Sequence, residues 1–237
     1  MTAGPRAVFF DAGFTLVEPV RAVPEVYLEA AAALGAALDR EAFLAHFGPT
    51  WRRVNLDYRS RHPGLETSEA LEREAWRHFT RAVAAPFEAL ERVHEAWHDR
   101  LVAHFDAPAS WRPIEGAREV LGTLRRRGIA LAVVSNWHRA LHRILAGLEL
   151  DRDLDLVLTS SDSGRKKPHP AIFAEARRRL DLDAASVRHV GDSWPDDVEG
   201  ARAAAIEPIW FNPRGDRAPG SPAEEIRRLT DLLDRLG

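Results

Sequence analysis

Short apolar runs alternate with amphipathic segments along most of this chain. Strand-like apolar runs are expected at 7–10, 129–136, 154–160, 187–192 and 207–211. Between and after them, apolar positions recur with helical spacing and predict helices at 116–128, 138–148, 170–180, 196–205 and 223–236. Strands that alternate with helices at this spacing are typical of an α/β protein. The pattern therefore predicts a doubly wound parallel sheet, with the last helix as a cover for the sheet.

A long helical stretch interrupts this alternation after the first strand. No strand pattern is found between residues 18 and 109. Helical spacing there predicts helices at 24–38, 40–47, 68–83 and 86–105. We therefore expect two units, a core built from 1–17 and 110–237, and an all-helical cap formed by 18–109.

Composition narrows the classes of function. The formal net charge of −3 does not favour a nucleic-acid partner. The absence of cysteine excludes disulfides and thiol nucleophiles. No apolar run is long enough to span a membrane, and Arg6 and Asp11 interrupt the early apolar stretch, so we expect a cytoplasmic protein without a membrane partner. Nothing in the sequence predicts the oligomeric state.

Polar residues gather where the predicted strands end. In open α/β sheets, ligands bind beyond the carboxyl ends of the strands, so these residues are expected at one rim. Carboxylates there favour Mg²⁺, and lysine and hydroxyl groups suit the oxygens of a phosphoryl group. A carboxylate beside a metal and a lysine stays ionised and can act as a nucleophile. The rim residues are Asp11, Thr15, Ser135, Asn136, Lys166, Lys167, Asp192, Asp196 and Asp197.

Four motifs in this order resemble those of the haloacid dehalogenase-like (HAD) superfamily. They are DAGFT (11–15), VVSN (133–136), RKKPHPAIF (165–173) and HVGDSWPDDVEGA (189–201). The helical insert matches the cap of that superfamily in its position along the chain. The resemblance implies a Rossmann-like core with an all-helical cap, and a hydrolase that uses Mg²⁺ to dephosphorylate a small phosphorylated metabolite.

The resemblance also implies roles for individual residues. Asp11 would attack phosphorus and form an aspartyl-phosphate, while Thr15 would organise the loop that follows it. Lys167, rather than Lys166, would neutralise the nucleophile and the phosphate. The substrate-binding residues would be Ser135, Asn136 and Lys167. The metal ligands would be Asp11, the carbonyl of Gly13, Asp192 and Asp197, with Asp196 as the alternative to Asp197.

Position 13 departs from the pattern of the superfamily. Most of its phosphatases carry aspartate there as general acid and base, a function worth about 10²–10⁴-fold in rate. This chain has Gly13. Three interpretations follow: a phosphatase that is slow, takes good leaving groups or uses another proton carrier such as His138; a dehalogenase-type hydrolase; or a HAD-fold protein that binds phosphate or a partner with little turnover.

A second motif points to different chemistry. The stretch HEAWH (94–98) matches the His-Glu-x-x-His pattern of zinc hydrolases, with His94 and His98 on one helical face and His104 nearby. The alternative interpretation, ordinary histidines on a cap helix, is favoured. Among the other aromatic residues, Trp51 is expected to pack in the cap, Trp137 can reach the site, and His189 is expected to be structural.

Overall fold

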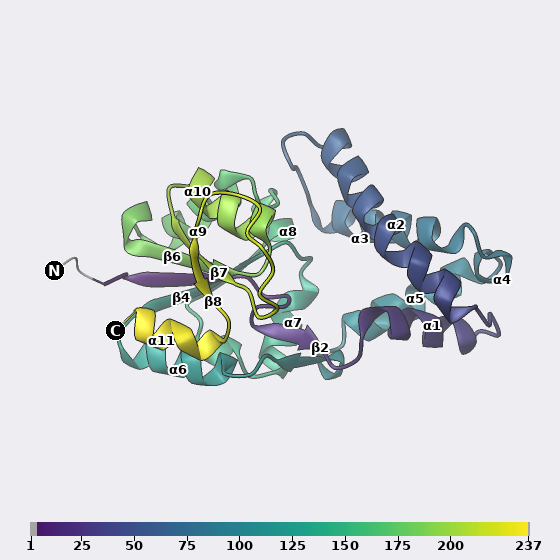
Figure 1. Cartoon of the computed structure of the whole chain (residues 1–237), viewed down its shortest axis with the longest axis horizontal. Coiled ribbons are helices and arrows are strands. Elements are labelled where there is room, and N and C mark those ends of the chain that lie inside the picture. Colours follow the sequence, from purple (N-terminus) through teal and green to yellow (C-terminus); the bar gives the residue numbers. More distant parts are fainter. Residues whose placement is uncertain (1–3, 237) are drawn as a thin grey trace.

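A six-stranded parallel sheet forms the centre of the molecule in the computed structural model, which describes residues 4–236 (Figure 1). The strand order is β5-β4-β1-β6-β7-β8, and every neighbouring pair is parallel. The strands are β1 (Ala7–Phe10), β4 (Ala130–Ser135), β5 (Leu156–Thr159), β6 (Val187–Gly191), β7 (Glu207–Phe211) and β8 (Glu224–Ile226). The predicted α/β fold class is therefore confirmed.

Helices cover both faces of this sheet and bury β1 completely. Val8 and Phe10 point into one apolar layer, and Ala7 and Phe9 point into the other. A strand buried on both faces has no polar side chain, which is why the run Ala7–Phe10 is continuously apolar. One layer is built by α6 (Ala117–Arg126), α7 (Ala140–Gly147) and α11 (Leu232–Arg235), and the other by α9 (Pro170–Leu180) and α10 (Gly200–Ala203).

The helical stretch lies beside the sheet and has an apolar core of its own, rich in aromatic rings (Figure 1). Its helices are α1 (Val23–Ala32), α2 (Arg40–Arg61), α3 (Glu69–Ala84), α4 (Glu88–Glu91) and α5 (His94–Phe105). An antiparallel ribbon of β2 (Val17–Pro19) and β3 (Trp111–Pro113) leads the chain into and out of it. None of the helices in residues 4–236 is long and apolar enough to cross a bilayer.

Several predicted helices have other bounds than expected. The helix predicted at 24–38 ends at Ala32, and the one predicted at 86–105 is divided into α4 and α5. The helix predicted at 40–47 continues through Pro49 to Arg61, because Val54 and Tyr58 on its later turns are buried. The helix predicted at 223–236 is wrong in its first part, where Glu224–Ile226 forms β8 instead. Ile226 is buried and pairs with Phe211, so completing the edge of the sheet overrides the helical pattern.

Candidate active site

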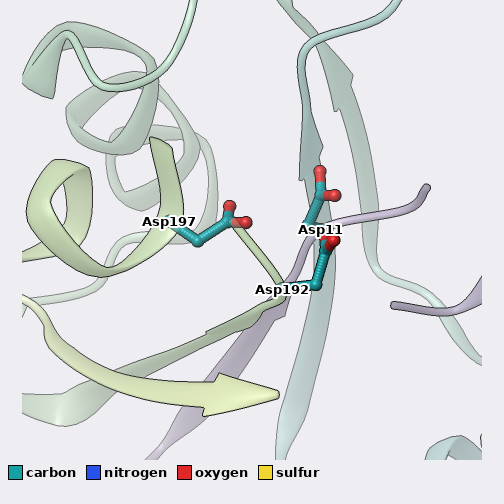
Figure 2. Close-up of side chains that lie close together, drawn as sticks. All are labelled: Asp11, Asp192 and Asp197. Atoms are coloured by element: carbon teal, nitrogen blue, oxygen red, sulfur yellow. The ribbon is translucent and has the colours of Figure 1, made fainter. Parts of the chain in front are cut away.

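Three carboxylates from different elements meet at the carboxyl edge of the sheet (Figure 2). Asp11 follows β1, Asp192 follows β6, and Asp197 lies in η4 (Trp194–Glu199), a π-helical turn. Each offers an oxygen within 4.8 Å of the oxygens of the other two. The backbone N–H of Asp11 donates to the carbonyl of Val190 (2.9 Å), so the parallel pairing of β1 with β6 continues to the site itself.

Lys167 is the cation at the centre of this cluster. Its Nζ donates to Asp11 Oδ1 and Asp197 Oδ1, both at 2.6 Å, and the side chain is only 2% exposed. Burial alone would lower the pKa of Lys167, but the two carboxylates raise it above its usual value, so the ammonium stays charged. Lys167 therefore has the contacts expected of it from the sequence.

Asn136 fixes the backbone of this lysine. Its Oδ1 accepts the N–H of Lys167 (2.6 Å), and its Nδ2 donates to the carbonyl of Lys167 (3.0 Å). Both polar atoms of the Asn136 amide are used in these bonds. Asn136 therefore positions Lys167, and its predicted contact with the substrate stays a prediction. Ser135 is buried beside them, and its hydroxyl acts to lower the pKa of Asp11 against the larger, raising effect of burial.

Asp197 is held by three donors. Its Oδ1 accepts from Lys167 and from His189 Nε2 (2.9 Å), and its Oδ2 accepts from the backbone N–H of Ser193 (3.0 Å). Burial would raise the pKa of Asp197, but Lys167 and His189 lower it to about 2. The neighbouring Asp196 pairs instead with Arg59 of α2 (2.6 Å). Of the two alternatives for the second acidic residue, Asp197 is thus the one that faces the cluster.

His189 is a member of the site that sequence analysis assigned only a structural role. It is fully buried in β6, and its ring packs edge-on against Phe173. Its Nε2 contact orients Asp197, as outer partners commonly orient the ligands of a metal. The signal in the sequence was a histidine beside Arg188 in a short predicted strand, which alone does not reveal its partner.

The cluster holds three carboxylates but only one ammonium, that of Lys167. Burial and the repulsion of Asp11 and Asp197 raise the pKa of Asp192 to about 7. Burial also raises the pKa of Asp11, against the opposing effect of Lys167. The Thr15 hydroxyl lies 3.5 Å from Asp192 Oδ1 and offers a weak hydrogen bond. Three carboxylates facing one ammonium form an all-oxygen donor set that fits a hard divalent cation such as Mg²⁺.

The turn after Asp11 does not itself require glycine at position 13. Only Phe14 in this turn has a positive φ, of 57°, and the carbonyl of Ala12 accepts the N–H groups of Leu16 and Val17 (both 2.9 Å). A Cβ on Gly13 would lie 3.3 Å from Cζ3 of Trp137, which is a tight contact. The indole of Trp137 therefore occupies the space beside Gly13.

His138 was the local candidate for a replacement acid. Its Nδ1 accepts the N–H of Ala140 (3.2 Å), its Nε2 lies 3.3 Å from Asp106, and its ring stacks on Trp76. Burial lowers the pKa of His138, with Asp106 acting in the opposite direction. Both nitrogens are engaged by groups outside the carboxylate cluster, and the role of His138 as a replacement acid stays a prediction.

The two histidines of the His-Glu-x-x-His motif, His94 and His98, are buried in the helical stretch. Thr80 Oγ1 lies 3.1 Å from His94 Nε2 and 3.0 Å from His98 Nδ1, so one hydroxyl joins both histidines. Burial lowers the pKa of His98 to about 4. Glu95 is exposed and pairs with Arg81. In the described part of the chain, the only group with metal-ligand spacing is the three-carboxylate cluster, so the zinc interpretation finds no support.

Lys166 lies next to Lys167 in sequence but serves another contact. Its Nζ donates to Glu72 Oε2 of α3 (2.8 Å). Glu72 Oε1 also accepts from the hydroxyls of Ser160 (2.8 Å) and Thr67 (2.9 Å). This Glu72 contact ties the helical stretch to the loop that carries Lys167.

An aromatic cavity of about 450 Å³ adjoins the cluster. Its wall includes Asn136, which bonds to the backbone of Lys167, and Phe14, which lies in the turn after Asp11. Trp51, which sequence analysis assigned to packing in the cap, also lies on that wall and is 53% exposed. The aromatic part of the wall includes Phe14, Trp51, Trp76, Phe79, Trp111 and Trp137.

A parallel α/β core with a helical insert after its first strand, and an aspartate at the end of that strand, is the arrangement of the HAD type of hydrolase. A family model for haloacid dehalogenase-like hydrolases matches residues 5–205. The chain therefore belongs to the haloacid dehalogenase-like hydrolase family, and the prediction of a hydrolase is confirmed at that level.

Individual relatives agree with this assignment. The chain is 34% identical to haloacid dehalogenase-like hydrolase domain-containing protein 3 of Mus musculus, over 85% of this chain and 79% of that protein. It is 34% identical to the glyceraldehyde 3-phosphate phosphatase of Pyrococcus abyssi, over 52% of this chain and 54% of that enzyme. The magnesium-bound HAD hydrolase YfnB of Bacillus subtilis shares the fold, with a TM-score of 0.77, 19% identity and 99% of each chain covered.

Proposed function

We propose that this hydrolase is a Mg²⁺-dependent phosphatase that acts on a small phosphomonoester through an aspartyl-phosphate on Asp11. The observation that carries the proposal is the buried Lys167 ammonium, 2.6 Å from Asp11, inside a cluster of three carboxylates. A phosphoryl group has the charge and the oxygens to match such a site. The phosphatase relative of Pyrococcus abyssi supports the same substrate class. A cytoplasmic location and the absence of a nucleic-acid partner stay predictions.

In this reaction each residue of the cluster has a separate role. Asp11 Oδ2 is free of the Lys167 contact and is the oxygen available for attack on phosphorus. Lys167 and the Ser135 hydroxyl receive the phosphoryl oxygens, and Thr15 steadies Asp192. A bound Mg²⁺ would supply positive charge to the phosphoryl group, and Asp11, the carbonyl of Gly13, Asp192 and Asp197 would hold it.

The two other interpretations explain fewer of these contacts. A dehalogenase-type reaction at Asp11 gives no role to Asp192, whose pKa is raised by burial among other carboxylates. A protein that only binds phosphate would use Lys167 but would have no need of a free carboxylate oxygen at the centre of its site. The Asp11 oxygen that does not contact Lys167 therefore favours turnover.

Phosphate release is the direct test of this function. We expect the wild-type protein to release inorganic phosphate from members of a phosphomonoester panel when Mg²⁺ is present, and to stop when a chelator removes the metal. Malachite green detection of phosphate, with and without chelator, measures both effects. If phosphate release is absent in wild type and appears only in Gly13→Asp, the binding interpretation replaces the phosphatase.

Mg²⁺ should also stabilise the folded protein independently of any substrate. A ligand present at a hundred times its Kd stabilises by about 2.7 kcal/mol, which corresponds to an increase in Tm of roughly 5–10 °C for a chain of this size. Differential scanning calorimetry with and without Mg²⁺ measures the shift. Asp192→Asn should remove most of the shift, and the matched Asp196→Asn should keep it, because Asp196 pairs with Arg59. Equal shifts in the two variants would contradict the assignment of Asp192.

A further inference from the structure

We propose that the substrate is an aryl phosphate, in which the phosphoryl group is bonded to the oxygen of a phenol-like ring that fills the aromatic cavity. This inference rests on the proposed phosphatase function and narrows it to one class of leaving group. Two independent features carry it: the lining of the cavity, and the position of Trp137 beside Gly13.

The cavity offers ring faces and edges from both parts of the molecule. Trp51 and Phe79 come from the helical stretch, and their rings meet edge to face at 5.0 Å. Trp111 and Trp137 come from the ribbon and from the loop after β4, and their rings meet at 4.8 Å. A volume of about 450 Å³ accommodates a substituted aromatic ring, which gains from such edge and face contacts.

Several polar side chains on the cavity wall, His138 among them, already have partners within the protein. The Tyr58 hydroxyl donates to the carbonyl of Glu66 (2.7 Å), and Asn55 Nδ2 donates to the carbonyl of Trp51 (2.9 Å). Tyr27, Asn136 and the Lys166–Glu72 pair are likewise engaged. Hydroxyls of a sugar phosphate would find few polar partners among these bonded groups, so their loss of water here would be unfavourable. The cavity therefore selects an apolar leaving group.

Trp137 lies both on the cavity wall and beside Gly13. Its indole lies 3.3 Å from the position of a Cβ on Gly13, and the same side chain lines the cavity. The leaving group would rest on the indole of Trp137. This indole lies beside the point where the side chain of an acid at position 13 would begin. Because φ of Gly13 is not in the left-handed region, the backbone itself does not explain the glycine.

The reaction then suits a leaving group that departs without a proton. Asp11 Oδ2 bonds to phosphorus, the bond from phosphorus to the aryl oxygen breaks, and its electron pair leaves on an aryloxide that takes a proton from solvent. Phenols have a pKa of about 10, whereas aliphatic alcohols lie near water at about 15.7. Water then attacks phosphorus, the bond from phosphorus to Asp11 Oδ2 breaks, inorganic phosphate leaves with the carboxylate of Asp11 restored, and a proton of that water passes to solvent.

A matched pair of esters tests this inference. Phenyl phosphate and cyclohexyl phosphate have similar size and differ mainly in the acidity of the leaving group. Wild-type protein with Mg²⁺ is mixed with each ester, and rapid chemical quench measures the rate at which Asp11 is phosphorylated. We expect phenyl phosphate to react at least about 10²-fold faster, the lower end of the contribution of a general acid. Glycerol phosphate should bind more weakly than either ester.

The variant Gly13→Asp/Trp137→Ala restores both an acid and the space for it. It should raise the rate with cyclohexyl phosphate by about 10²–10⁴-fold relative to Trp137→Ala alone, with a smaller change for phenyl phosphate. Circular dichroism and Tm check that both variants fold. Equal wild-type rates for cyclohexyl, glycerol and phenyl phosphate overturn the aryl preference while the phosphatase function stands. If no ester phosphorylates the wild type, the phosphatase function and this inference fall together.

Discussion

Asp11→Asn is expected to lower phosphate release by at least roughly 10³-fold, as the loss of a covalent nucleophile does in other enzymes. The amide keeps the shape of the side chain and an oxygen that accepts from Lys167 (2.6 Å in wild type), but it lacks the charge needed for attack. Steady-state phosphate release with Mg²⁺ measures the effect. Mass spectrometry should detect an aspartyl-phosphate in wild type and none in the variant.

The fold of this variant should remain intact, because the substitution removes one of three crowded carboxylates. A Tm equal to or above that of wild type separates lost chemistry from lost structure. The matched control is Asp196→Asn, which changes an aspartate of the same motif whose partner is Arg59. Retention of wild-type activity in Asp11→Asn would mean that another group attacks phosphorus, and the mechanism would have to be abandoned.

Lys167→Met should lose both activity and stability. Removing one partner of a buried ion pair typically costs about 3–5 kcal/mol, and Lys167 is the ammonium that compensates both Asp11 and Asp197. Urea unfolding measures the loss. Without this ammonium the folded-state pKa values of the carboxylates rise above their unfolded values. The variant should therefore be relatively more stable at low pH, and that stability should decline as pH rises through the raised folded-state values.

Lys166→Met is the matched control for this prediction. It removes the adjacent lysine, but Glu72 keeps the Ser160 and Thr67 hydroxyls as donors at 2.8 and 2.9 Å. We expect Lys166→Met to lose less stability than Lys167→Met. Unlike Lys167→Met, it should not become relatively more stable at low pH. Equal losses of stability in the two variants would show that the contacts of Lys167 with Asp11 and Asp197 contribute no more than the contact of Lys166 with Glu72.

Sequence patterns predicted most of the site because its residues follow strands. Asp11, Ser135 and Asp192 each stand where an apolar run ends, and parallel strands bring those ends to one edge. The choice of Lys167 over Lys166 came from family resemblance. In the structure the first contacts Asp11 and the second contacts Glu72.

What the sequence did not predict depends on contacts between distant residues. Nothing local to Gly13 indicates that Trp137 lies over it, and nothing local to His189 indicates its bond to Asp197 across a π-helical turn. The last strand was missed for a similar reason. The segment Glu224–Ile226 has a helical pattern, and only the open edge of β7 makes it a strand.

The central position of β1 has a consequence for how this protein is made. Ala7 pairs with Ala130 on one side and with Val187 on the other, so both neighbours of the first strand are synthesised long after it. Pairings between such distant segments form slowly, since a long loop must close first. During translation the helical stretch can fold before β4 and β6, which pair with β1, have been synthesised. Asp11 thus reaches its final surroundings only after the two strands beside β1 have been synthesised.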